Sequence, residues 1–252
     1  MNRKVVGVNS DVKCLNVRWE GRAHCEKCAI RKHTLFAELD VVAYEPLLRP
    51  IQQYCFPATK LIYAQGVMAS DVFVVRKGLL KLEETLHDGT QRIVRLVEPG
   101  HVAGTECLLD HQHHYEHSAV ALRETEVCQI PSSILHRLAG QKPEFFETLM
   151  EHWHRQLHSA EQIIVEFSTG TVRERVARIM LKLIALAERE HKSGIQVPTV
   201  RDMSAMTGVT RESISRVMAE FKRSSLLVKV GPNRMQYDLA GLQGIAELEF
   251  DD

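Results

Sequence analysis

The chain has 252 residues, with 32 acidic and 32 basic side chains, 44% hydrophobic residues and 25% charged residues. These values are those of an ordinary globular protein, and they exclude both wholesale disorder and a uniformly basic nucleic-acid-binding protein. No apolar run approaches the roughly 18 residues that span a bilayer, and no secretory signal follows Met1. We therefore expect a cytoplasmic protein with no membrane partner, whose six cysteines are structural thiols, a metal site or a redox site.

Charge is spread unevenly along the chain. Residues 171–240 contain thirteen Lys and Arg against seven Asp and Glu, whereas the tail from Gly241 adds four acidic residues and no basic one. The neutral total therefore hides a basic module near the C-terminus, which is the first indication of a nucleic-acid-binding half.

The predicted elements begin with a polar, irregular arm over residues 1–40, which contains Cys14, Cys25 and Cys28. Residues 41–142 have the pattern of a small antiparallel β-roll, because short apolar runs alternate there with turn residues. One predicted hairpin turn contains Gly89, since glycine accepts a positive φ at low cost. The predicted strands are Val72–Val75, Leu79–Leu82, Ile93–Val97, Ala119–Leu122 and Val127–Ile130.

From Pro143 the hydrophobic period becomes helical. Apolar residues alternately four and three positions apart predict one amphipathic helix over residues 143–168, with a narrow a/d seam of about three heptads. We interpret this seam as the interface of a parallel homodimer, in which the small Ala160 lets two helices approach closely; the alternative is a helix packed on its own domain. The seam residues are Phe146, Met150, Trp153, Leu157, Ala160, Ile164 and Phe167.

Residues 169–245 predict a winged helix-turn-helix domain. A capping-box pattern at Thr171 starts one helix, and Thr199 and Thr210 are the expected N-caps of the two helices that follow. Gly208 suits the tight turn between those two helices. The alternative is an ordinary helical hairpin with a solvated charged face, which explains neither the caps nor the downstream apolar alternation that predicts a hairpin wing.

The second helix of this pair carries an exposed polar face at its start. Arg can donate two hydrogen bonds to guanine, Glu can accept one from cytosine, and Ser can do either, so this face suits base edges in the DNA major groove. Two cations in the last turn suit phosphate contacts. The side chains predicted to contact DNA are Thr210, Arg211, Glu212, Ser215, Arg216, Lys222 and Arg223.

A β-roll, a long helix and a winged helix-turn-helix in this order resemble the CRP/FNR family of bacterial transcription regulators. The most specific segment, Gly208–Val217, is similar both to the Arg-Glu-x-x-x-Arg helix of the cyclic-AMP receptor branch and to the Glu-x-x-Ser-Arg helix of the FNR branch. The resemblance implies an α+β fold with a cyclic-nucleotide-binding-like jelly roll, a homodimer, RNA polymerase as a partner, and palindromic DNA with TTGAT- or TGTGA-like half-sites. Glycines that match the corners of the family's roll are Gly66, Gly78, Gly89, Gly100 and Gly104.

The resemblance also bears on the effector. Members that bind cyclic nucleotides use a Gly-Glu pair and an Arg-Ser-Ala segment, and the matching segments here are Gly104–Glu106 and His117–Ala119. His in place of Arg removes a permanently charged, bidentate phosphate partner. We therefore expect that cyclic AMP is not the effector.

The FNR branch holds a [4Fe–4S] cluster with N-terminal cysteines and one cysteine of the roll. Here Cys25 and Cys28 form a Cys-x-x-Cys pair, and Cys128 matches the roll ligand. The family's third N-terminal cysteine has no counterpart, so the fourth ligand is Cys14, if the arm folds back, or His33. The resemblance implies an iron–sulfur sensor of oxygen or redox state; zinc, a redox dithiol and plain core thiols are the alternatives.

The remaining cysteines and histidines favour plainer roles. Cys55 and Cys107 lie in apolar surroundings and are expected in the core, and His111–His117 is expected at a solvated hairpin tip, with a metal or haem site as the alternative. The main alternative function is the same regulator with a haem, thiol-redox or small-molecule sensor, and the remote one is a thiol or metal redox enzyme. We expect no enzyme, because the Cys-x-x-Cys pair does not open a helix after a strand. Ala160 stands near a position where some cluster-dependent relatives have an acidic residue, so the dimer is expected to persist without a cluster.

Overall fold

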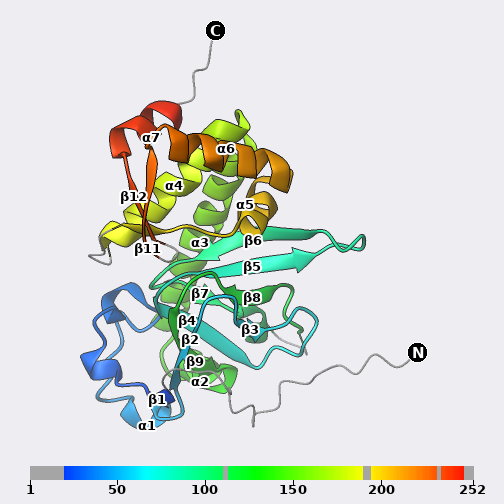
Figure 1. Cartoon of the computed structure of the whole chain (residues 1–252). Coiled ribbons are helices and arrows are strands. Elements are labelled where there is room, and N and C mark those ends of the chain that lie inside the picture. The colour runs from blue at the N-terminus through cyan, green and yellow to red at the C-terminus, as the bar shows by residue number, and fades with distance from the viewer. Residues whose placement is uncertain (1–19, 110–112, 190–193, 232–233, 247–252) are drawn as a thin grey trace. The chain divides into compact units, whose positions relative to one another are not determined.

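The structure, a computed structural model, describes residues 20–109, 113–189, 194–231 and 234–246. These residues form antiparallel β-sheets in the N-terminal part and mainly helices in the C-terminal part, which confirms the predicted α+β class (Figure 1). The chain divides into two compact units, one with the residues up to Glu84 and Val94–His158, the other with Thr85–Ile93 and the residues from Ser159. No helix among the described residues is long and apolar enough to cross a membrane.

Two antiparallel sheets of the described residues form the β-roll. Their strand orders are β1-β2-β9-β4-β7 and β3-β8-β5-β6. Each of the five predicted strands overlaps one of these strands, whereas β1, β2, β3 and β7 were not predicted. The strands are β1 (Glu20–Arg22), β2 (Gln52–Phe56), β3 (Leu61–Tyr63), β4 (Asp71–Lys77), β5 (Leu80–Thr85), β6 (Gln91–Val97), β7 (Val102–Ala103), β8 (Ser118–Ala121) and β9 (Thr125–Pro131).

Glycines form tight corners of the roll. The five glycines expected there all have a positive φ. At Gly78 φ is +97°, and an added Cβ would lie 2.4 Å from the backbone oxygen of Glu124, so a side chain does not fit. In the predicted hairpin turn Gly89 has φ +82°, and the Leu86 N–H donates to the Thr90 carbonyl at 2.9 Å, which confirms the turn.

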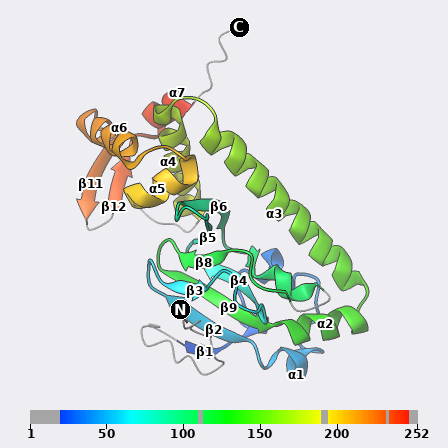
Figure 2. The same cartoon turned by 90° about the vertical axis from the view of Figure 1, so that its right-hand side faces the viewer.

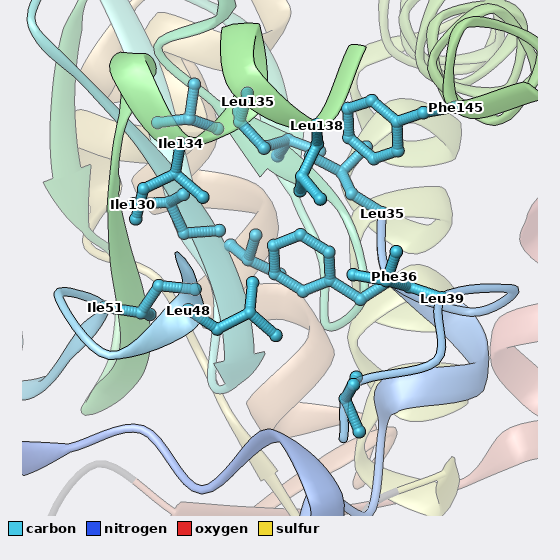
Figure 3. Close-up of a cluster of buried hydrophobic side chains, with 14 of the residues drawn as sticks. Leu35, Phe36, Leu39, Leu48, Ile51, Ile130, Ile134, Leu135, Leu138 and Phe145 are labelled. Atoms are coloured by element: carbon cyan, nitrogen blue, oxygen red, sulfur yellow. The ribbon is translucent and has the colours of Figure 1, made fainter. Parts of the chain in front are cut away.

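The described residues before β2 pack onto the roll, so the arm predicted as irregular over residues 1–40 is ordered in its described part. The segment before β2 contains the short helical turns η1 (Cys25–Lys27), η2 (Arg31–His33) and α1 (Glu45–Leu48). Its apolar side chains pack against β9 and the helix α2 (Ser132–Gln141), as Figure 3 shows. These side chains, all at most 6% exposed, are Leu35, Phe36, Leu39, Val41, Leu48 and Ile51. Burial of one such side chain contributes about 1.5–3 kcal/mol, so the segment is firmly anchored.

Helix α3 (Glu144–Ser168) follows α2 as one continuous rod (Figure 2), which confirms the helix predicted over residues 143–168. Its buried residues are Phe145, His152, Gln156, Ile163 and Phe167. Phe167 is only 1% exposed in the single chain, so its assignment to the dimer seam is wrong. The heptad spacing reaches this residue, but its side chain is buried in the second unit, to which the end of α3 belongs.

The second unit is a winged helix-turn-helix with additional helices. Its sheet has the order β10-β12-β11, in which β11 and β12 form the predicted wing. The wing's second strand ends at Tyr237 and a helix starts at Leu239, because Asp238 accepts hydrogen bonds from the N–H groups of Gly241 and Leu242. The elements are α4 (Val172–Arg189), β10 (Ile195–Gln196), α5 (Val200–Thr207), α6 (Arg211–Arg223), β11 (Leu227–Gly231), β12 (Arg234–Tyr237) and α7 (Leu239–Ala246).

Candidate nucleic-acid interface and thiol pocket

Side-chain caps and a glycine turn set the geometry of α5 and α6. The Thr199 hydroxyl accepts from the Asp202 N–H at 3.1 Å, and the Asp202 carboxylate accepts from the Thr199 N–H at 3.3 Å, so α5 begins with a complete capping box. Gly208, at φ +71°, ends α5. The Thr210 hydroxyl then accepts from the Ser213 N–H at 3.3 Å and starts α6. The predicted helix-turn-helix is therefore present.

Helix α6 is anchored by one apolar face and leaves its polar face open. Ile214, Met218 and Phe221 are at most 6% exposed. The Arg216 guanidinium lies 3.1 Å from the Glu212 carboxylate, with 74% and 82% of these side chains exposed. Such an exposed pair contributes little to stability, so both groups are available to a ligand. The structure brings the predicted base-reading residues together on this open face, and they are Arg211, Glu212, Ser215 and Arg216.

The cations expected to contact phosphates are also exposed. Lys222 and Arg223 lie in the last turn of α6. The wing adds exposed Lys229 and Arg234, which the sequence reasoning did not single out. The wing had been predicted as a hairpin, and the alternation of side chains along its strands was the signal that could have identified them.

Most of the predicted dimer seam is an uncovered apolar stripe on α3. Five of its residues are 47–63% exposed in the single chain, and Ala160 is half-buried. The exposed five are Phe146, Met150, Trp153, Leu157 and Ile164. A contiguous exposed apolar stripe of this kind marks an interaction surface.

Three of the predicted metal-ligating thiols line one pocket. Cys25 and Cys28 belong to η1 and the turn after it, and Cys128 lies on β9 between β2 and β4. His24 also lines the pocket, whereas His33 is not part of its lining, and Cys14 lies outside the described residues. The fold therefore unites residues that are about a hundred positions apart in the sequence.

The pocket does not favour free thiolates. Burial raises the pKa of Cys25 and raises the pKa of Cys128 to about 12, although the positive charge of Arg76 opposes both shifts. A nucleophilic redox cysteine requires a lowered pKa, so this pocket lacks the electrostatics of a thiol–disulfide enzyme. A bound metal cluster would instead remove the thiol protons outright.

The donor set also bears on which metal group fits. The sulfur atoms of Cys25, Cys28 and Cys128 do not all lie within 4.8 Å of one another. By comparison, a single zinc ion with Zn–S distances of about 2.3 Å holds its sulfur ligands about 3.8 Å apart. Arg76 also lines the pocket: its Nε atom is buried without a hydrogen-bond partner among the described residues, and its Nη1 atom lies 3.8 Å from the Glu126 carboxylate. Thiols that do not all lie within 4.8 Å of one another suit a group larger than a single zinc ion, and an iron–sulfur cluster is such a group with thiolate ligands.

The other predicted sites are placed as follows. Cys55 and Cys107 are 7% and 8% exposed, which confirms them as core residues. His117 lies beside Glu106 in the roll. Of the histidine-rich segment, His111 lies outside the described residues.

Comparisons with known proteins agree with this architecture. A cyclic nucleotide-binding domain model matches residues 55–142, and a Crp-like helix-turn-helix domain model matches residues 174–245. The chain is 27% identical over 241 residues to the transcriptional activator protein FnrA of Stutzerimonas stutzeri, covering 92% of this chain and 96% of that protein. It is also 27% identical to the transcriptional activator protein anr of Pseudomonas aeruginosa, over 86% of this chain and 90% of that protein.

Solved structures show the same fold. A CRP-family transcriptional regulator from Thermus thermophilus superposes with a TM-score of 0.65 at 25% identity, over 76% of this chain and 95% of that chain. FixK2 from Bradyrhizobium japonicum superposes with a TM-score of 0.65 at 23% identity, over 78% of this chain and 97% of that chain.

Proposed function

Because the chain belongs to the CRP/FNR family of transcription regulators, we propose that it is a homodimeric member that responds to oxygen or redox state through an iron–sulfur cluster. It is a DNA-binding regulator and not an enzyme. One observation carries the proposed sensor: Cys25, Cys28 and Cys128 line a single pocket.

The exposed face of α6 is proposed to read DNA. In the major groove, Arg211 and Arg216 suit guanine, Glu212 suits cytosine, and Ser215 suits either. Lys222 and Arg223 suit the phosphates that set the position of the helix. Two such helices, about 34 Å apart in a dimer, would read a palindrome with TTGAT- or TGTGA-like half-sites. RNA polymerase is the proposed protein partner of the DNA-bound dimer.

The exposed stripe of α3 is the proposed dimer interface. Each large apolar side chain that a partner helix covers contributes about 1.5–3 kcal/mol, and the stripe offers five of them. The half-buried Ala160 leaves room for close approach of a second helix. No acidic residue opposes that approach at this point, so the dimer is proposed to persist when the thiol pocket is empty.

The thiol pocket is in contact with α3 through its own wall. Thr34 and Phe36 line the pocket. Phe36 belongs to the same buried cluster as Phe145 in the first turn of α3 (Figure 3). A change in the pocket should therefore alter the packing of α3, the helix that carries the exposed apolar stripe. Such a link between two distinct sites is what a sensor needs.

The cluster's ligands are proposed to be Cys25, Cys28, Cys128 and Cys14. When bound, a [4Fe–4S] cluster would supply iron–sulfur bonds that oxygen attacks and electrons that it removes. The protein's own contribution is to bury the site beside Arg76, whose positive charge favours the ligands as thiolates. Cyclic AMP is proposed not to be the effector, because His117 stands where a phosphate would need an arginine.

The test is the absorption spectrum of protein purified without air, with iron and sulfide assays. We expect a brown protein with about four iron and four sulfide per chain, and loss of both in Cys25→Ser. Cys55→Ala, which removes a core thiol outside the pocket, should retain them. A colourless, iron-free wild-type protein would overturn the proposed sensor and leave the DNA-binding function intact.

A further inference from the structure

A second cluster of metal-ligating side chains lies in the β-roll, apart from the thiol pocket. One ligand atom each of Glu106, Glu116 and His117 lies within 4.8 Å of the other two. Glu106 is on η3 (Thr105–Leu108), and the other two residues directly precede β8. We propose that these three side chains bind one divalent transition-metal ion and so form a cation site within the β-roll.

The cluster carries two carboxylates, and the charge of the buried Arg95 guanidinium acts on one of them, Glu106. Among the described residues, neither carboxylate forms an ion pair with a Lys or Arg. The nearby Arg95 guanidinium donates instead to the Gln156 side chain on α3, at 2.8 Å. Two unpaired carboxylates beside an imidazole attract a cation and repel an anion such as a phosphate.

A buried hydroxyl without a partner is the independent sign of a missing ligand. Tyr63 is 2% exposed, and its hydroxyl makes no hydrogen bond with any described residue. The Tyr63 ring stacks on the ring of Tyr115, the residue before Glu116, so Tyr63 lies beside the segment that carries two of the three ligands. An unpaired buried hydroxyl costs about 1–3 kcal/mol. An ion held by three side chains keeps water in its open positions, and such a water is a suitable partner for Tyr63.

The cluster is held in place by its surroundings. The Glu116 N–H donates to the Glu106 carboxylate at 3.3 Å. The ring of Tyr115, next to Glu116, stacks on Tyr63 at a centroid distance of 3.9 Å, and its hydroxyl donates to the Asp71 carbonyl at 2.9 Å. The ligands therefore need little rearrangement to bind an ion.

The chemistry of the donors selects the class of ion. Carboxylate oxygens suit Mg²⁺, Ca²⁺ and Mn²⁺, whereas imidazole suits Zn²⁺, Fe²⁺ and other transition metals, so the mixed set favours a divalent first-row ion. Zn²⁺ would also bind the thiols of the other pocket. Mn²⁺ is therefore the probe of choice, because it takes oxygen and nitrogen ligands and has a low affinity for thiolates.

The test is a titration of the full-length, metal-free protein with Mn²⁺, in which the sharp electron paramagnetic resonance signal of the free ion reports binding. We expect one site per chain, weakened at least tenfold in Glu106→Gln, Glu116→Gln and His117→Ala. Glu116 is exposed, so its replacement leaves the packing intact. His114→Ala, an exposed histidine of the same segment, is the matched control and should bind as the wild type does.

Two further variants sharpen the result. Tyr63→Phe should weaken Mn²⁺ binding several-fold, because it removes the proposed partner of a metal-bound water. Cys25→Ser should leave Mn²⁺ binding unchanged, so failure of the iron–sulfur proposal is distinguishable from failure of this one. Wild-type protein that leaves Mn²⁺ free, or Glu116→Gln and His117→Ala variants that bind with wild-type affinity, would overturn the proposed site.

Discussion

The replacement Arg216→Ala separates DNA recognition from stability. The Arg216 side chain is 74% exposed and pairs with a Glu212 side chain that is 82% exposed, so its loss should change the free energy of unfolding by less than about 1 kcal/mol. One bidentate contact between arginine and guanine is worth about 1–3 kcal/mol. A dimer makes two, and their loss should weaken specific binding by about thirtyfold to more than ten-thousandfold.

The assay is fluorescence anisotropy with a palindromic TTGAT or TGTGA duplex and a scrambled duplex, at one fixed salt concentration. Arg216→Ala should lose affinity for the palindrome and little for the scrambled duplex. The matched variant Lys222→Ala should instead weaken both equally and reduce the salt dependence by about one ion per subunit. If Arg216→Ala still discriminates between the duplexes as the wild type does, α6 is not the reading helix.

Three further outcomes follow from packing and burial. Gly78→Ala should lower the free energy of unfolding by more than about 1 kcal/mol, because φ is +97° and no space exists for a Cβ. Gly140→Ala in α2, where an added Cβ would meet no atom within 4 Å, should raise the free energy of unfolding by about 0.4–1 kcal/mol. Urea denaturation of the two variants measures both changes. Leu157→Glu, at a position 60% exposed in the single chain, should convert the dimer to a monomer in sedimentation velocity, and a dimer that persists would contradict the proposed interface. Since burial raises the pKa of Cys128 from 9.0 to about 12, only the unfolded thiol ionises between these values, so the stability of the metal-free protein is full below pH 9 and falls above it. In urea denaturation at a series of pH values, Cys128→Ser should reduce the loss of unfolding free energy above pH 9. An unchanged loss would refute the claim that burial of the Cys128 thiol causes it.

Local chemistry made much of the fold predictable from the sequence. The caps Thr199 and Thr210 and the turn at Gly208 act within a few residues of themselves, so the helix-turn-helix could be predicted with its reading face. The strand β2 (Gln52–Phe56) was missed because it begins with two glutamines, of which Gln53 is buried at 6% exposure. Such burial depends on the neighbouring strands and not on a local pattern.

The thiol pocket shows where prediction from sequence stops. The resemblance named Cys25, Cys28 and Cys128, but their approach depends on the position of β9 between β2 and β4 and on the packing of residues 35–51 against α2. The polar composition of the first residues concealed that packing. Likewise, the seam spacing extends to Phe167, although tertiary contacts bury that residue inside one chain.

The most direct test of the proposed sensor is DNA affinity before and after exposure to air. Anaerobically purified wild-type protein should bind the palindromic duplex, and air should reduce that affinity more than tenfold as the thiol pocket loses its cluster. A variant with Cys25→Ser and Cys28→Ser should show the same affinity with and without air. A wild-type protein whose DNA affinity does not depend on air would contradict the account.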